Sequence, residues 1–153
     1  MKTTSRLLFF LLAVVSLVSC KNQLHVVTLY VDTDQIQLSN TDQHANFGQP
    51  LGISNTDFTT HVRKGDRVIW QGVSISNPAD QVKITSINYV SGERLFQRIS
   101  LSGKRGGDEM VTGAIKMKPG KFEAYLKEKY SINFTLSNKA GTFNLDPVIK
   151  AYR

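Results

Sequence analysis

The sequence has 153 residues and a formal net charge of +7, from 19 lysines and arginines against 12 aspartates and glutamates. This length fits one domain with a substantial hydrophobic core, and the single cysteine excludes an internal disulfide bond. A basic balance favours anionic neighbours such as lipid headgroups or acidic glycans. The N-terminal segment points to the cell envelope, which argues against nucleic acid as a partner.

The first residues have the composition of an export signal. Lys2 and Arg6 precede an uncharged apolar run, LLFFLLAVVSLV, at residues 7–18. This run is shorter than the ~20 residues that an α-helix needs to span a bilayer. A basic start, a short apolar stretch and a small residue before the cleavage point are typical of a secretory signal peptide.

The cysteine directly follows this segment. Leu17-Val18-Ser19-Cys20 matches the bacterial lipobox, Leu-x-small-Cys, in which the thiol is alkylated with diacylglycerol and the chain is cut just before it. We expect residues 1–19 to be a lipoprotein signal peptide, 20–23 a tether lipidated at Cys20, and 24–153 a single domain. Cleavage would lower the net charge from +7 to +5, because two cations are lost with the leader.

The residue after the cysteine bears on the location. Lys21 is not the aspartate associated with inner-membrane retention, so we expect an outer-membrane anchor. The acidic residues that follow the cysteine in surface-exported lipoproteins are also missing, which is compatible with a periplasmic face; the sequence does not decide between the periplasmic and the surface side.

Beyond the leader, short stretches rich in β-branched and aromatic residues recur between turn signals, as β-strands do. The stretches are LHVVTLYV (24–31), QIQL (35–38), FTTHV (58–62), RVIWQGVSI (67–75), QVKITSINYV (81–90), ERLFQRI (93–99), EMVTGAIKM (109–117), KYSINFTLSN (129–138) and TFNLDPVIKAY (142–152). Eight or nine such strands, without a long helical pattern, predict an all-β fold, an antiparallel β-sandwich with immunoglobulin-like architecture. The polar stretch 39–50 is expected to be a loop.

Three of these segments carry further local predictions. Residues 130–136 alternate strictly between apolar and polar side chains, which predicts one buried and one solvated face. The alternation in 81–90 changes phase, which predicts a β-bulge. Pro147 lacks an N–H group, so we expect the last strand to break there or to lie at a sheet edge.

One segment is predicted to be helical. In KFEAYLKEKY, Phe122, Tyr125 and Leu126 have helical spacing, and Glu123 precedes Lys127 by four residues. We expect one short helix near 121–129 that leads into the strand after it.

The stretch HVRKGDRVIW, residues 61–70, resembles part of the cupredoxins. That resemblance implies a blue-copper site, which needs two histidines and a cysteine, usually with an axial methionine. No histidine follows His61, and Cys20 is assigned to lipid. We therefore expect no metal; His25 and His44 are far from His61 in sequence and do not have zinc-ligand spacing.

Two carboxylates remain as candidate ligands of a hard cation. Asp32 and Asp34 are two residues apart in VDTD and could share Ca²⁺ if further oxygens converged on them. The alternative, which we favour, is that both cap a turn by accepting backbone N–H groups.

Catalytic motifs are not evident. The sequence has no Gly-x-Ser-x-Gly elbow, and its glutamates lie beside Lys or Arg or in turns, as solvated ion partners do. We therefore expect no enzymatic activity and no cofactor.

The candidate binding residues are Trp70 and the cations around it, Arg63, Lys64 and Arg67. Trp70 is predicted to be a core residue, although a tryptophan on a strand can also stack on a sugar ring. Other basic residues flank turns and are expected to form a solvated rim, which could bind anions if the loops converge: Lys104, Arg105, Lys116, Lys118 and Lys121.

Several motifs together resemble the AidA/PixA-type inclusion-body protein family. They are VVTLYVDTD near the start, Gly65-Asp66, WQGVSI, ITSINYVSGERLF and Asp146-Pro147-Val148-Ile149. The resemblance covers most of the domain and implies a small, cupredoxin-like all-β protein with no known catalysis. The inclusion-forming members are intracellular, whereas this chain has a lipobox; short β-sandwich lipoproteins of Bacteroidota are similar as well.

The leading functional hypothesis is a non-enzymatic, lipid-anchored β-sandwich of the cell envelope with a binding or structural role. It would contact the membrane through its lipid, and an anionic glycan or an envelope protein through its surface. The alternative is a metal-binding, cupredoxin-like protein that holds Ca²⁺ or copper. An enzyme acting on glycans is the third hypothesis.

Overall fold

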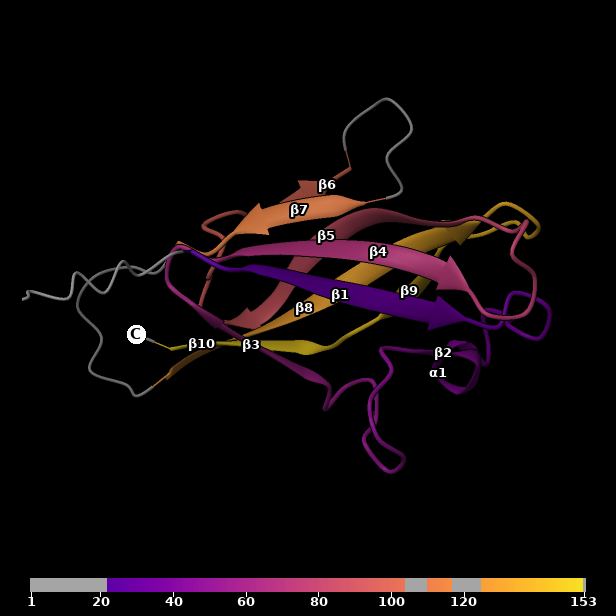
Figure 1. Cartoon of the computed structure of the whole chain (residues 1–153), viewed down its shortest axis with the longest axis horizontal. Helices are drawn as coiled ribbons and strands as arrows, with labels where there is room; N and C mark the ends of the chain where they lie inside the picture. The colour runs from indigo at the N-terminus through magenta and orange to yellow at the C-terminus, as the bar shows by residue number, and fades with distance from the viewer. Residues whose placement is uncertain (1–21, 104–109, 117–124, 153) are drawn as a thin grey trace, which may run out of the picture.

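The computed structural model describes residues 22–103, 110–116 and 125–152, which form two β-sheets packed face to face (Figure 1). The first sheet has the strand order β2 (Ala45–Asn46), β1 (Leu24–Val31), β4 (Arg67–Ser74) and β7 (Val111–Ala114). The second has the order β3 (Thr59–Arg63), β10 (Val148–Tyr152), β8 (Tyr125–Leu136), β5 (Val82–Gly92) and β6 (Ser100–Ser102), and β9 (Phe143–Leu145) also pairs with β8. The one helix among these residues, α1, spans Thr41–His44.

The core lies between the two sheets and follows from the alternation of the strands. In β4, Val68 and Trp70 are buried, and in β8 every second residue from Leu126 to Leu136 is buried. Stacked and edge-to-face aromatic pairs fill the centre: Trp70 with Tyr130 and Phe96, and Phe134 with Phe143. The predicted half-buried strand at 130–136 is confirmed.

The β-rich sandwich is confirmed, but the expectation of a purely antiparallel one is wrong. β1 pairs with β4 in parallel, and β3 pairs with β10 in parallel. The reason is the path of the chain. After β1 and β2 the chain crosses to the second sheet for β3 and then returns for β4, so β4 re-enters the first sheet in the direction of β1.

The prediction of a helix near 121–129 is wrong for the residues of this range that the structure describes. Residues 125–129 belong to β8, whereas 121–124 lie outside the described residues. Leu126, Glu128 and Tyr130 all face the core, as alternate residues of a strand do. The charged Glu128 hides this alternation in the sequence, because a glutamate is not expected on an apolar face. Residues 35–38 and 93–99 form turns instead of strands, and the expected loop at 39–50 contains α1 and β2.

Two local predictions are confirmed. β5 has register shifts against β8 between Ile84 and Ser86 and between Tyr89 and Ser91. Pro147 separates β9 from β10, so the strand breaks there. β10 itself is not an edge strand, because it lies between β3 and β8.

Several strand ends meet at one end of the sandwich, which we call the basal end. β1 and β4 begin there, with Leu24 paired to Arg67, and β7 ends there, with Ala114 paired to Arg67 (Figure 1). β3 and β10 end there as well, with Tyr152 paired to Arg63. The basal end is therefore the end nearest in sequence to Cys20. Within the described ranges, no helix is both long and apolar enough to cross a bilayer.

Candidate functional site

The site at the basal end is built around Asp66, in the turn between β3 and β4. Gly65 precedes it with φ of +92°, a conformation that favours glycine. The Asp66 carboxylate is buried and accepts hydrogen bonds from the backbone N–H groups of Gln23 and Arg63, each at 2.8 Å. Nε2 of His25 lies 2.8 Å from its Oδ2 atom. The Gly-Asp turn thus joins the start of β1 to the end of β3.

These contacts keep the Asp66 carboxylate ionised. Burial by itself would raise the pKa of Asp66, but the N–H donors of Gln23 and Arg63, together with the His25 imidazole, lower the pKa below its ordinary value. Because this charge is already satisfied inside the protein, Asp66 acts as a positioning group for His25.

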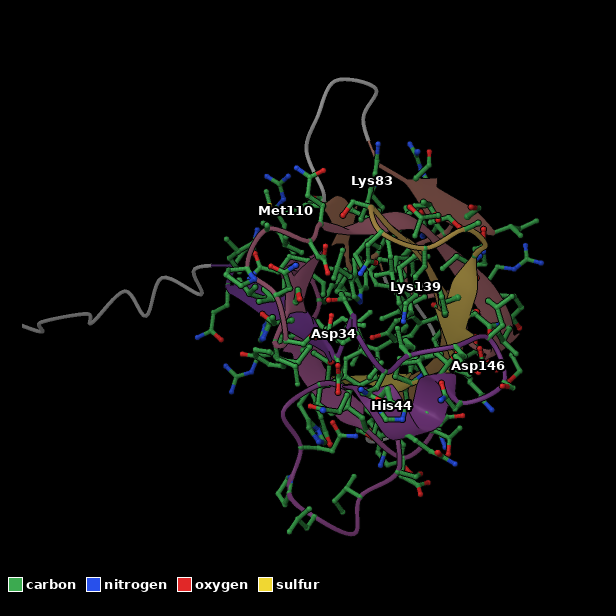
Figure 2. The ribbon with its side chains drawn as sticks, turned by 90° about the vertical axis from the view of Figure 1, so that its right-hand side faces the viewer. Asp34, His44, Lys83, Met110, Lys139 and Asp146 are labelled. Atoms are coloured by element: carbon green, nitrogen blue, oxygen red, sulfur yellow. The ribbon has the colours of Figure 1, made fainter. Side chains whose placement is uncertain are left out.

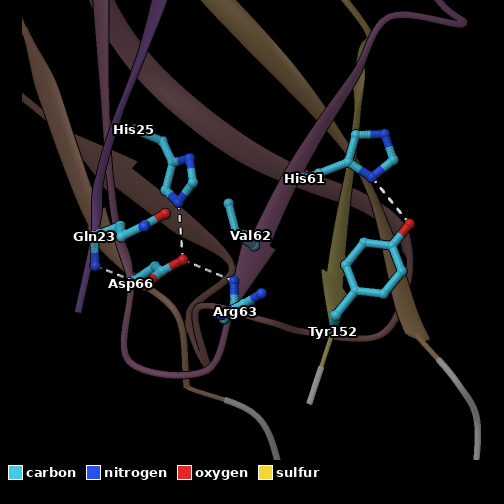
Figure 3. Close-up of a pocket in the computed structure, with 7 residues that line it drawn as sticks. All are labelled: Gln23, His25, His61, Val62, Arg63, Asp66 and Tyr152. Atoms are coloured by element: carbon cyan, nitrogen blue, oxygen red, sulfur yellow. Dashed lines mark hydrogen bonds and ion pairs between the residues drawn. The ribbon is translucent and has the colours of Figure 1, made fainter. Parts of the chain in front are cut away.

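A pocket of about 430 Å³ opens beside this turn (Figure 3). It lies between β1 of one sheet and β3 and β10 of the other. Its lining residues are Gln23, His25, His61, Val62, Arg63, Asp66 and Tyr152. The two sheets thus bring together His25 and His61, which are far apart in the sequence.

Figure 3 shows an aromatic pair on the far wall of the pocket. The rings of His61 and Tyr152 stack with a centroid distance of 5.6 Å and an interplanar angle of 22°. Nδ1 of His61 lies 2.9 Å from the Tyr152 hydroxyl oxygen. Arg63 lies two residues after His61 on the same strand. The pocket therefore offers a flat aromatic surface, several hydrogen-bonding groups and one permanent cation.

The predicted binding residues do not form one cluster. Arg63 lines this pocket, Lys64 is exposed in the turn, and Arg67 lines a separate groove. Trp70 is fully buried, and its Nε1–H donates to the Tyr130 hydroxyl at 3.1 Å. Trp70 is thus the core residue that we favoured, and it presents no surface for a sugar.

The acidic pair of the VDTD motif lies at the opposite end of the sandwich. Oδ1 of Asp32 accepts the backbone N–H groups of Asp34 and Gln35, each at 3.2 Å, so the turn-capping interpretation is confirmed for Asp32. For Asp34, the structure instead shows its backbone carbonyl accepting a hydrogen bond from Nζ of Lys139 at 2.7 Å (Figure 2). Among the described residues, no three His, Cys, Asp or Glu side chains are placed to hold a metal ion.

The threonine between these two acids, Thr33, makes a network of hydrogen bonds. Thr33 is fully buried, and its hydroxyl donates to Oδ2 of Asp80 at 2.6 Å and lies 2.8 Å from the Ser74 hydroxyl. Asn138 also donates to Asp80, at 2.7 Å. VDTD therefore ties β1 to the loops after β4 and β8, which is a structural role.

A second carboxyl group is buried as well. The glutamates were predicted to be solvated ion partners, and for Glu128 that prediction is wrong. Glu128 is 2% exposed, and its Oε2 accepts the backbone N–H of Leu95 at 2.5 Å. Burial raises the pKa of Glu128 to about 7, although the N–H groups of Leu95 and Phe96 and the charge of Arg94 favour the ionised form. Glu128 thereby fixes the turn after β5 against β8.

Some predicted sites cannot be compared with the structure. Cys20 and the segment 1–19 lie outside the described residues, as do the basic residues Lys104, Arg105, Lys118 and Lys121. Sequence reasoning considered His25 and His61 only as metal ligands, and it did not single out Tyr152. The Gly65-Asp66 turn was noted for its resemblance and not as the centre of a site.

Comparison of the sequence with models of known protein families gives no match, and comparison with curated proteins gives none either.

Proposed function

We propose that this protein is a non-enzymatic, lipid-anchored β-sandwich of the cell envelope, held in the outer membrane through Cys20, and that its basal pocket binds an acidic glycan. The observation that carries the proposal is the pocket itself. It combines the stacked His61–Tyr152 pair with Arg63, next to an Asp66 whose charge is already satisfied. An aromatic face suits the C–H face of a sugar ring, and a guanidinium suits its carboxylate.

A binding role fits the chemistry of the pocket better than a catalytic one. Asp66 orients His25, as in a hydrolase, but no Ser, Thr or Cys nucleophile is among the described residues that line the pocket. The metal-binding alternative gains no favouring observation from the described ligand residues. The resemblance to the AidA/PixA family stays a prediction, and the proposed role does not depend on it.

Calorimetric titration of the purified protein with an oligogalacturonate tests the pocket, with an uncharged oligogalactose as the comparison ligand. We expect binding of the acidic ligand only. Arg63→Gln should weaken it about tenfold, because a charge-assisted hydrogen bond is lost. Tyr152→Ala should weaken it by a similar factor through the lost stacking surface.

The matched control is Lys83→Gln, which removes an exposed cation where β5 begins, on the edge of the sandwich away from the basal pocket (Figure 2). This variant should bind like the unmodified protein. Equal affinity for the acidic and neutral oligomers, or equal loss in Lys83→Gln and Arg63→Gln, would contradict the assignment of the pocket.

A further inference from the structure

A second depression lies at the basal end, on the side of the sandwich where β7 and β6 are the edge strands. It has a volume of about 320 Å³ and is lined by three cations, Arg67, Arg98 and Lys116. They come from three separate segments: the start of β4, the turn before β6 and the residues after β7. None of the described residues that line it is an aspartate or glutamate. We call it the basic groove.

The backbone around the basic groove is held firmly. The N–H of Arg67 donates to the Gln23 carbonyl at 2.8 Å, and the N–H of Lys116 donates to the Leu95 carbonyl at 2.5 Å. Gly113 allows β7 to pack tightly here, since a Cβ atom at this position would lie 2.7 Å from Cδ1 of Leu101. Arg67 and Lys116 therefore extend from fixed backbone positions, and no acid among the described residues of the groove offsets its positive charge.

Exposed apolar side chains lie beside these cations. Leu24, which pairs with Arg67, is 58% exposed, and Ile99, which follows Arg98, is 63% exposed. Cations next to exposed aliphatic side chains suit the boundary between lipid headgroups and acyl chains.

The position of the anchor brings this surface to a membrane. Gln23 follows Cys20 by three residues, which span at most about 10 Å when fully extended. The backbone carbonyl of Gln23 accepts a hydrogen bond from the backbone N–H of Arg67. We propose that the basic groove docks on the phosphate groups of anionic lipid headgroups in the membrane that holds the Cys20 lipid. This docking rests on the lipid anchor of the proposed function, and it fixes the orientation of the domain on the bilayer.

The single tryptophan makes the docking measurable. Trp70 is the only tryptophan in the sequence, so energy transfer from Trp70 to dansyl-labelled lipid reports how close the domain lies to the bilayer. The mature protein, with the lipid on Cys20, is reconstituted into vesicles of phosphatidylcholine alone or of phosphatidylcholine with phosphatidylglycerol. Both kinds of vesicle carry the same fraction of dansyl-labelled lipid. We expect more transfer on the anionic vesicles at low salt. High salt should remove the difference, because it shortens the Debye length.

Variants assign the effect to the groove. Each of Arg67→Gln, Arg98→Gln and Lys116→Gln should lower the ratio of docked to undocked domain about fivefold, as expected for one cation near an anionic surface. Lys83→Gln should leave that ratio unchanged. Equal transfer on neutral and anionic vesicles, or equal effects of Lys83→Gln and the groove variants, would overturn the proposal.

Two further readouts separate the groove from the anchor and from free phosphate. Flotation of the protein with neutral vesicles depends on the lipid anchor alone. If the protein does not float with neutral vesicles, its flotation with anionic vesicles at low salt still measures binding through the groove. Inorganic phosphate is the competing ligand. Docking that persists in millimolar phosphate supports a surface for lipid headgroups. If phosphate abolishes docking while chloride at the same ionic strength does not, the groove is instead a site for the free phosphate ion.

Discussion

At the residue scale, two buried carboxyl groups have opposite electrostatic roles. Asp66 is surrounded by donors, and these lower the pKa of its carboxyl despite burial. Glu128 receives fewer donors for its degree of burial, and its pKa rises to about 7. The first group therefore stabilises the folded protein in its ionised form, whereas the second does so in its protonated form.

Glu128 predicts a dependence of stability on pH. Its folded pKa of about 7 lies above its ordinary value of 4.5, so the native state binds a proton that the unfolded chain releases. The stability that Glu128 contributes is complete below pH about 4.5 and is lost as the pH rises through about 7. In Glu128→Gln, the amide oxygen can still accept the Leu95 N–H, and this loss should disappear.

Urea unfolding at several pH values between 5 and 8 measures the effect. The free energy of unfolding should fall more steeply with pH in the unmodified protein than in Glu128→Gln. Asp34→Asn, which changes an exposed acid, should keep the steeper slope. Parallel slopes for the unmodified protein and Glu128→Gln would contradict the raised pKa.

At the scale of the elements, the long β5–β8 pair organises the second sheet. Near its basal end, Gly92 faces Glu128 with φ of +92°. A Cβ atom at Gly92 would overlap the backbone carbonyl oxygen of Lys127, which cannot move without breaking the pairing. This glycine is therefore needed both for its conformation and for the close approach of the two strands.

Gly92→Ala should destabilise the domain by at least about 2 kcal/mol, because it adds a backbone collision to the strain of a left-handed conformation. Gly52→Ala is the matched control, since Gly52 has φ of +90° but a Cβ atom there would meet no other atom within 4 Å. Chemical denaturation should show the smaller loss in Gly52→Ala. Equal losses would mean that the collision at Gly92 is relieved.

The sequence predicted the strands better than their arrangement. β1, β4 and the later part of β8 follow from alternation and β-branched residues, and the break at Pro147 follows from its missing N–H group. The start of β8 was wrongly predicted because Tyr125 and Leu126 have helical spacing with Phe122, and the buried Glu128 interrupts the apolar alternation that would have indicated a strand. The direction of a strand relative to its neighbour depends on the path of the chain between the two sheets. No short stretch of the sequence therefore indicates that β1 and β4, or β3 and β10, pair in parallel.

The same limit applies to the site. His25 and His61 lie on different sheets, and only the packing of the sheets places them around one pocket. Trp70 was recognisable as a core residue from its place in an alternating strand. Arg67, although its neighbours in sequence include Arg63 and Lys64, lines the basic groove with Arg98 and Lys116 instead.

At the scale of the whole molecule, the sandwich has two unlike ends. The basal end carries the pocket, the basic groove and the start of β1, whereas the opposite end is closed by the hydrogen-bonded network around Thr33. A lipid on Cys20 would be attached at the basal end. Both candidate binding surfaces would then face the membrane or the narrow layer next to it.

Replacing the cysteine tests this arrangement. Cys20→Ala should leave the leader uncut by the lipoprotein peptidase and remove the acyl groups, which mass spectrometry of the protein detects directly. Cys20→Ser is the conservative comparison, and it should fail in the same way because an alcohol does not form the thioether. A fully processed, membrane-bound Cys20→Ala protein in high salt would exclude the lipid anchor.

The position of β10 also sets the order in which the protein can fold. β10 is inserted between β3 and β8, so the second sheet has a gap until residues 148–152 have been synthesised. A chain without β10 cannot form the native second sheet, because β10 is the strand that joins β3 to β8. On the proposed export route, a topology that β10 completes would keep the polypeptide unfolded during transport, and the second sheet would close only after β10 had crossed the membrane.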